Sequence, residues 1–211
     1  MSSERLPMKG IFIAVSGPSG SGKTSVCKAL LERFPQLHFS VSLTTRPPRP
    51  LETNGKDYHF VTEAEFRDRI GRGDLIEWAE NFGQLYGTSR ETMEVALRGG
   101  HDLLLDVDTR GARALKKAWP GGIFVFVIPP SIEELERRLR GRGSETEETI
   151  RRRFDNALSE IREIVWYDYI IMNDKLDAAI ESLRSVYVAE TCRRERMMVK
   201  IKPFFDRSGG N

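Results

Sequence analysis

Apolar runs alternate along the chain with segments in which apolar residues recur every three or four positions. The first apolar run covers residues 11–15, and residues 25–31 after it have helical spacing. The same pairing of a strand with a helix returns at 102–108 and 109–118, at 122–128 and 132–140, and at 169–173 and 176–191. Strands and helices in this order predict an α/β fold with a parallel sheet core flanked by helices.

The stretch 43–100 departs from this pattern. A second strand is expected at 37–42, and after it the sequence Thr-Thr-Arg-Pro-Pro-Arg-Pro at 44–50 excludes helix and central strand, since each proline fixes φ and removes a donor. Beyond that loop we expect short strands at 57–61 and 75–79, a helix at 62–70 with a Thr62–Glu65 capping box, and a helix at 89–98 that ends at Gly99 and Gly100. This stretch therefore predicts a mixed α/β insertion.

A polar helical segment at 145–164 is separated from the preceding helix by Gly-Arg-Gly-Ser at 141–144, which predicts a mobile lid. The tail carries mixed charge and ends in Ser-Gly-Gly-Asn, so we expect partial disorder there. The predicted division is a core (9–42, 101–137 and 165–192), an insertion (43–100), a lid (138–164) and a tail (193–211).

Composition narrows the class of protein. With 211 residues, 39% of them hydrophobic and 30% charged, the chain suits one core with insertions. A formal charge of +2 gives no general argument for nucleic acid or membrane as a partner. Cys27 and Cys192 match no metal spacing and suit a reducing compartment. The chain shows no secretory signal or membrane-spanning run, and we expect a cytoplasmic protein.

The octapeptide Gly-Pro-Ser-Gly-Ser-Gly-Lys-Thr at 17–24 fits the phosphate-loop pattern G-x-x-x-x-G-K-[ST], between a predicted strand and a predicted helix. Its glycines allow successive backbone N–H groups to turn toward one anion at the helix N-terminus. Lys23 is expected to reach the β- and γ-phosphates, and Thr24 offers Mg²⁺ a hydroxyl oxygen. The segment therefore predicts a nucleotide-phosphate site.

The strand at 102–108 ends in two carboxylates and has the pattern of a Walker B strand. Asp106 is expected beside the phosphate loop, where it can hold Mg²⁺ through water. Which of Asp106 and Asp108 does more for the metal stays open from the residues alone.

Seven segments in the same order resemble the guanylate kinases of the nucleoside monophosphate kinase group, and the resemblance extends from Lys9 to Thr191. They are Ser-Gly-Pro-Ser-Gly-Ser-Gly-Lys-Thr (16–24), Ser-Val-Ser-Leu-Thr-Thr-Arg-Pro-Pro-Arg-Pro (40–50), Asn-Gly-Lys-Asp-Tyr-His-Phe-Val (54–61), Ile-Glu-Trp-Ala (76–79), Tyr-Gly-Thr (86–88), Asp-Val-Asp (106–108) and Arg-Leu-Arg-Gly-Arg-Gly-Ser-Glu-Thr (138–146). The resemblance implies that ATP gives its γ-phosphoryl group to GMP with Mg²⁺ as cofactor. Positioning and charge neutralisation then carry catalysis, because the acceptor is already a phosphate.

The resemblance also assigns roles to individual residues. The implied catalytic cations are Lys23, Arg46 and the lid arginines Arg138, Arg142 and Arg153. The implied ATP contacts are Gly17, Pro18, Ser19, Gly20, Ser21, Gly22, Lys23, Thr24, Ser25 and Asn173. From spacing alone the lid arginines equally suit a solvated helix face paired with nearby glutamates. Asn173 is the weaker assignment, since Asn-Asp is also common turn chemistry.

Recognition of the acceptor divides between phosphate and base. By resemblance, the phosphate is held by Arg46, Arg49, Tyr58 and Tyr86. Glu77 and Asp108 can accept from the N1 and N2 donors of guanine, and the hydroxyls of Ser42 and Thr88 can serve its O6 side. Adenine would leave a buried carboxylate unpaired. None of these contacts involves the sugar, so dGMP is expected to be an acceptor too.

Three residues depart from the family pattern, namely Leu43, Leu51 and Arg110, and none of them is an implied ligand. The alternatives are an interaction module that uses the acceptor face without catalysis, a small-molecule kinase with another acceptor, and nucleic-acid binding by the basic tail. Intact Lys23 and Thr24 disfavour the first, and acidic residues interleaved in the tail disfavour the last. A signalling GTPase is excluded by the lack of Asn-Lys-x-Asp. ATP and GMP are the expected partners, and a homo-oligomer is possible.

Overall fold

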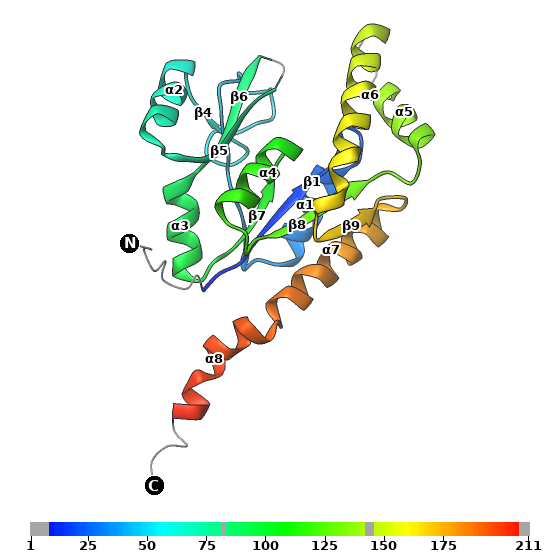
Figure 1. Ribbon diagram of the computed structural model, residues 1–211. Coiled ribbons are helices and arrows are strands. Elements are labelled where there is room, and N and C mark those ends of the chain that lie inside the picture. The colour runs from blue at the N-terminus through cyan, green and yellow to red at the C-terminus, as the bar shows by residue number, and fades with distance from the viewer. Residues whose placement is uncertain (1–8, 82, 142–145, 207–211) are drawn as a thin grey trace.

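A five-stranded parallel sheet forms the centre of the molecule in the computed structural model, which describes residues 9–81, 83–141 and 146–206 (Figure 1). The strand order is β2-β7-β1-β8-β9, and each adjacent pair runs parallel. The strands are β1 (Phe12–Ser16), β2 (Leu37–Phe39), β7 (Asp102–Asp106), β8 (Ile123–Ile128) and β9 (Tyr169–Met172). The α/β fold with a parallel core, predicted from the alternating pattern, is confirmed.

Helices cover both faces of this sheet. Along β1, Ile13 and Val15 face one apolar cluster, whereas Phe12 and Ala14 face the other. This agrees with the near-continuous apolar run expected of a strand buried on both sides. The first cluster includes residues of α1 (Lys23–Arg33) and α7 (Leu176–Thr191), and the second includes residues of α3 (Arg90–Gly99) and α4 (Thr109–Ala118).

The insertion forms a second sheet of four strands in the order β4-β3-β6-β5. Its strands are β3 (Leu43–Thr44), β4 (His59–Phe60), β5 (Leu75–Asn81) and β6 (Gln84–Ser89). Helix α2 (Glu63–Arg72) buries Phe66 against this sheet, and both halves of the predicted Thr62–Glu65 capping box are formed. The short strand β6 was not predicted, and it pairs antiparallel with β5 as a hairpin.

The predicted strand 37–42 is wrong in its extent. Residues 37–39 pair with β7, whereas residues 43–44 belong to the second sheet. The last link to the central sheet is the Ser40 N–H, which donates to the Leu104 carbonyl at 2.9 Å. Residues 40–42 therefore carry the chain from one sheet to the other, a change of partner that periodicity along one strand does not report.

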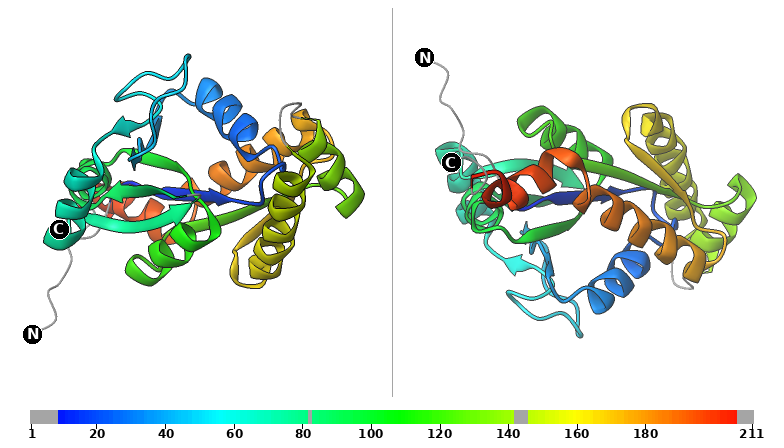
Figure 2. Two further views of the ribbon diagram at one scale, coloured as in Figure 1. Left: turned by 90° about the horizontal axis from the view of Figure 1, so that it is seen from above. Right: turned by 90° about the horizontal axis from the view of Figure 1, so that it is seen from below.

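The segment predicted as a lid, 138–164, includes the end of α5 (Ile132–Arg140), the whole of α6 (Glu147–Ile161) and the start of a 3₁₀ turn, η1 (Arg162–Trp166), which leads from α6 to β9. Helices α5 and α6 share a small apolar cluster of their own, centred on Leu135, Leu139 and Ala157. This helix pair and the second sheet stand at opposite ends of the molecule in both views of Figure 2. Both lie beyond the same end of the central sheet, the end at which its parallel strands terminate (Figure 1).

The chain continues past α7 into α8 (Arg194–Asp206), which extends away from the sheet at the end where its strands begin (Figure 1). Most of the predicted tail is thus helical, and the disorder expected at its end falls on residues 207–211, outside the described residues. No helix in the part of the chain that the structure describes has the length and apolar character needed to span a membrane.

Candidate nucleotide site

The phosphate loop joins the end of β1 to the start of α1, in the context its sequence predicts. Gly22 is the N-cap residue of α1 with φ of 83°, and a Cβ there would lie 2.2 Å from Asn173 Nδ2. A side chain is therefore excluded at this position by backbone conformation and by space. No side chain in the described part of the chain caps α1, which leaves the first N–H groups of the helix to an anionic ligand.

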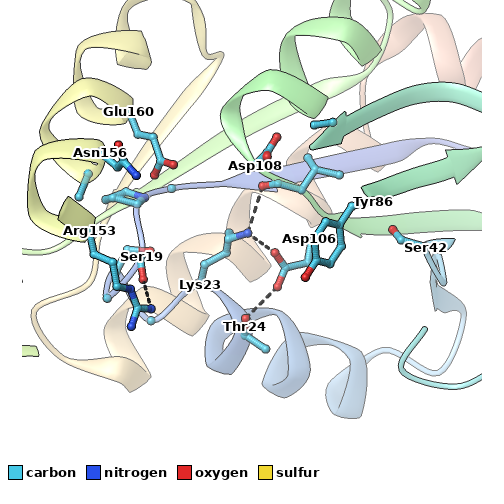
Figure 3. Close-up of a pocket in the computed structure, with 18 of the residues that line it drawn as sticks. Ser19, Lys23, Thr24, Ser42, Tyr86, Asp106, Asp108, Arg153, Asn156 and Glu160 are labelled. Atoms are coloured by element: carbon cyan, nitrogen blue, oxygen red, sulfur yellow. Dashed lines mark hydrogen bonds and ion pairs between the residues drawn. The ribbon is translucent and has the colours of Figure 1, made fainter. Parts of the chain in front are cut away.

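Lys23 is held at the end of the neighbouring strand. Its ammonium forms an ion pair with Asp106 and donates to the Val107 carbonyl at 3.0 Å (Figure 3). Burial alone would lower the pKa of Lys23, but the charge and hydrogen bond of Asp106 outweigh it and the pKa is raised. The lysine therefore stays protonated and aimed along the loop, as contact with phosphate oxygens requires.

Oxygen ligands suited to Mg²⁺ lie beside Lys23. The Thr24 hydroxyl donates to Asp106 Oδ2 at 2.9 Å, so a hydroxyl and a carboxylate meet at the mouth of the loop. The described residues contain no group of three or more His, Cys, Asp or Glu side chains that could hold a metal. The pair fits a magnesium site in which nucleotide phosphates and water complete the coordination, as is usual for this ion.

A cavity of about 430 Å³ runs from the phosphate loop to the second sheet. It gathers most of the predicted site residues, and Figure 3 shows side chains from both sheets and from α6 facing it. The predicted residues that line it are Gly17, Pro18, Ser19, Gly20, Ser21, Gly22, Lys23, Thr24, Ser25, Ser42, Arg49, Tyr58, Glu77, Tyr86, Asp106, Asp108 and Arg153. Residues far apart in the sequence thus share one cavity.

Two carboxylates lie at the far end of this cavity. Glu77, on β5, is only 7% exposed and accepts a hydrogen bond of 2.7 Å from the Thr88 hydroxyl across the β5–β6 hairpin. Burial raises the pKa of Glu77 to about 7, the Thr88 bond opposes the rise, and the charge of Asp108 adds to it. Asp108 caps α4 by accepting from the Gly111 N–H at 2.7 Å. A Cβ on Gly111 would lie 2.8 Å from Glu77 Oε2, so a side chain there would force the Glu77 carboxylate to shift.

Thr88 is placed differently from its prediction. The residue is 1% exposed, does not line the cavity, and donates a hydrogen bond from its hydroxyl to Glu77. In this structure it orients the carboxylate and does not face a ligand directly. The register that pairs Glu77 with Thr88 across the hairpin is the physical reason.

The proline-rich loop carries Arg46 and Arg49. Arg49 lines the cavity, whereas the guanidinium of Arg46 lies over the ring of Tyr58, with Cζ 5.5 Å from its centroid. Arg46 forms an ion pair of 2.8 Å with Glu52, whose hydrogen bond is the largest cause of a raised Arg46 pKa. Arg46 thus borders the cavity without lining it.

The lid arginines occupy different positions. Arg153, on α6, donates to the Ser19 hydroxyl of the phosphate loop at 2.7 Å (Figure 3). Arg138, on α5, bonds instead to Glu134 at 2.6 Å and to the Asn173 carbonyl at 2.9 Å, outside the cavity lining. Arg142 lies outside the described residues.

Asn173 supports the phosphate loop from behind. It is 5% exposed, and its side-chain amide donates to the Ser21 carbonyl at 2.7 Å. It does not line the cavity, and the adenine contact implied for it stays a prediction.

Sequence reasoning missed two polar residues that line the cavity from α6, Asn156 and Glu160. With Arg153 and Ala157 they recur at the i, i+3, i+4 and i+7 spacing of one helix face. That spacing could have identified them once Arg153 was assigned to the site. Burial, and then the charge of Asp108, raise the pKa of Glu160 to about 7.

Comparison with known proteins matches this arrangement to one family. The sequence profile described as "Guanylate kinase" matches residues 9–190. The chain is 50% identical over 198 residues to the guanylate kinase of Geobacter metallireducens, which covers 94% of this chain and 98% of that one. It is 47% identical over 191 residues to the guanylate kinase of Myxococcus xanthus, covering 90% and 91%. Among solved structures, the guanylate kinase of Anaplasma phagocytophilum superposes with a TM-score of 0.74 at 33% identity, covering 90% of this chain and 91% of that one.

Proposed function

The chain belongs to the guanylate kinase family and is an ATP:GMP phosphotransferase that forms ADP and GDP, and we propose here how its residues divide this reaction. The observation that carries the proposal is the single cavity that joins the phosphate loop to a pair of base-reading carboxylates. A donor site and an acceptor site in one cavity allow direct transfer between two bound nucleotides.

On the donor side, the backbone N–H groups of residues 17–25 cradle the ATP phosphates at the start of α1, and Lys23 neutralises charge on the β- and γ-phosphates. Its ion pair with Asp106 and its bond to the Val107 carbonyl support this role, since both fix the ammonium before the nucleotide arrives. A preorganised cation stabilises the transferring phosphoryl group without reorganisation during the reaction.

We assign Mg²⁺ to Thr24 and, through water, to Asp106. When bound, the ion neutralises the phosphate oxygens and holds them in line for transfer. The Thr24 hydroxyl would supply a hard oxygen to the ion, and the Asp106 carboxylate, which accepts from that hydroxyl at 2.9 Å, would hold the ion through a water molecule.

On the acceptor side, Arg46, Arg49, Tyr58 and Tyr86 hold the GMP phosphate with guanidinium and phenol donors. Their positions around the proline-rich loop and β6 support this grouping. Of the two arginines, Arg49 lines the cavity and Arg46 lies over the ring of Tyr58.

The guanine base is read by Glu77 and Asp108, each with an oxygen left to accept from N1 or N2. One oxygen of Glu77 accepts from the Thr88 hydroxyl, and one oxygen of Asp108 accepts from the Gly111 N–H. These hydrogen bonds fix the two carboxylates, which supports their role as acceptors for the base. Ser42 lies on the cavity wall and can donate to O6. A ligand that lacks the two donors would leave buried carboxylates unpaired, and adenine is rejected for this reason.

The lid, residues 138–164, closes when both nucleotides are bound. Arg153 then exchanges the Ser19 hydroxyl for phosphate oxygens, and Arg138 exchanges Glu134 for the same kind of acceptor. Arg142 is assigned to the same set by its motif. Closure excludes water and so limits hydrolysis of ATP.

The remaining assignments concern the setting of the enzyme. The core, insertion and lid move as the three parts predicted from the sequence, and dGMP serves as an acceptor because no assigned contact touches the sugar. We place the enzyme in the cytoplasm, in accord with its two free thiols, Cys27 and Cys192.

Release of ADP from ATP and Mg²⁺, measured with GMP, dGMP, AMP, UMP and CMP in turn and without an acceptor, tests the assignment. Turnover with GMP and dGMP and little with AMP is expected. Equal turnover with AMP would reject the base-reading carboxylates, and GMP binding without turnover would indicate an interaction module instead.

A further inference from the structure

Glu52 is an acidic residue placed among the arginines that are assigned to the acceptor phosphate. Its Oε1 accepts from Arg46 Nη2 at 2.8 Å, and its Oε2 accepts from the Arg49 backbone N–H at 2.8 Å. The side chains of Glu52 and Arg46 are each 16% exposed. One carboxylate therefore links both arginine positions of the loop while being largely shielded from solvent.

Arg46 is restrained on its other sides as well. Its Nη1 donates to the Pro47 carbonyl at 2.7 Å, and its guanidinium lies over the Tyr58 and Phe60 rings, at 5.5 and 5.9 Å from their centroids. Tyr86, which lines the cavity, is a further cause of the raised pKa of Arg46, after Glu52. The guanidinium is thus held between Glu52 on one side and the acceptor end of the cavity on the other.

We propose that Glu52 is a positioning residue for the acceptor phosphate, which fixes the guanidinium of Arg46 so that its remaining donors face the cavity. The inference rests on the proposed role of Arg46. An arginine has five N–H donors. In this structure Glu52 and the Pro47 carbonyl take one each, which leaves three donors for a phosphate.

The loop itself explains why such a restraint is needed. Residues 46–52 contain Pro47, Pro48 and Pro50 and form no helix or strand, so no regular backbone ladder holds the two arginines. The Glu52 N–H donates to the Arg49 carbonyl at 3.0 Å, and this bond closes a turn that its own side chain reinforces. A long side chain fixed before binding loses less rotamer entropy when the phosphate arrives.

A carboxylate near a phosphate site has a second possible effect, which is competition with the ligand for Arg46. The two effects have opposite signs. If positioning dominates, removal of the Glu52 carboxylate weakens GMP binding. If competition dominates, the same change frees the guanidinium and strengthens it. The hydrogen bond that Glu52 accepts from the Arg49 N–H favours positioning, because it restrains the loop backbone, and competition for Arg46 alone does not require such a bond.

The test compares steady-state kinetics of the full chain carrying Glu52→Ala, Glu52→Gln, Arg46→Gln or the Arg46→Gln/Glu52→Gln pair. We expect KM for GMP to rise about tenfold in Glu52→Ala and about threefold in Glu52→Gln, which keeps the shape and loses the charge. kcat and KM for ATP should stay within about twofold of the parent protein. The double variant should add nothing to the effect of Arg46→Gln, because Glu52 acts through Arg46.

Glu63→Ala is the matched control, since it removes an exposed 2.6 Å ion pair with Arg67 from the outside of the same insertion. It should leave KM for GMP unchanged. An unchanged or lowered KM for GMP in both Glu52 variants, while Arg46→Gln raises it, overturns the inference alone. An unchanged KM in Arg46→Gln rejects the assigned role of Arg46 as well.

Discussion

The burial of Glu77, the carboxyl assigned to the base, is expected to lower the stability of the folded protein. The carboxyl is 7% exposed, receives one side-chain hydrogen bond, from Thr88, and has its pKa raised from 4.5 to about 7. Between those values the folded protein holds a proton that the unfolded chain has released, so stability falls as pH rises from 4.5 to 7 and is then constant for this group. At about 1.36 kcal/mol per unit, the cost above pH 7 reaches about 3 kcal/mol.

The substitution Glu77→Gln removes this cost and keeps an oxygen to accept from Thr88. At pH 8 we expect the variant to gain up to about 3 kcal/mol in the free energy of unfolding by urea, and Tm to rise by roughly 6–12 °C. At pH 4.5 the two proteins should be about equally stable. KM for GMP should rise by about 10- to 100-fold, because a hydrogen bond to a charged group is worth about 1.5–3 kcal/mol and the amide offers one fewer acceptor.

Glu80→Gln is the control, because Glu80 lies on the same strand but is exposed. Circular dichroism during urea titration at pH 5, 6, 7 and 8 measures the difference between variant and parent. If Glu77→Gln is no more stable than the parent at pH 8, or if the difference does not shrink toward pH 5, burial of an ionised Glu77 is not what sets its energetics.

Other substitutions test the remaining parts of the site. Lys23→Ala should lower kcat on the order of 10³-fold and also lower Tm, because the change leaves the Asp106 carboxylate without its ion pair; ADP release and thermal melting measure the two effects, and full activity in a folded protein would reject the assigned mechanism. Gly22→Ala should lower stability by about 1–3 kcal/mol in urea, because its Cβ would lie 2.2 Å from Asn173 Nδ2 at a φ of 83°, and an unchanged unfolding midpoint would contradict this. Glu160→Gln should gain stability at pH 8 but not at pH 5, since its folded pKa is raised to about 7, and a gain equal at both pH values would refute that sign.

Local patterns allowed accurate prediction where the structure is local. Helices α4, α5 and α7 begin and end at the predicted residues, because the signals that bound them lie in the neighbouring sequence. Asp108 and Ser131 cap α4 and α5, whereas α7, whose N-cap residue makes no side-chain cap hydrogen bond, follows from its apolar spacing. The phosphate loop was predictable for the same reason, since one continuous octapeptide specifies it.

Features that depend on a distant partner were not predictable. The role of Thr88 follows from its register opposite Glu77, and strand β6 forms because β5 lies beside it. The seating of Arg46 depends on Glu52 and on rings from β4 and the preceding loop, none of which a motif specifies. Tertiary contacts decide which strands pair, and the strand propensity of one segment does not identify its partner.

The position of the second sheet in the chain has a consequence for how acceptor choice can change. The insertion leaves the core after β2 and returns at β7, and these strands are direct neighbours, with Phe39 opposite Leu104. Because the two strands run parallel, the chain leaves at the carboxyl end of β2 and returns at the amino end of β7, and α3, which packs on the central sheet, spans the distance between these two junctions. A different acceptor-binding unit could be transplanted between the same junctions while the donor loop and α1 kept their surroundings. Such a graft would have to keep or rebuild two interfaces with the core, the contact between α4 and β5 and the packing of α3 against β7.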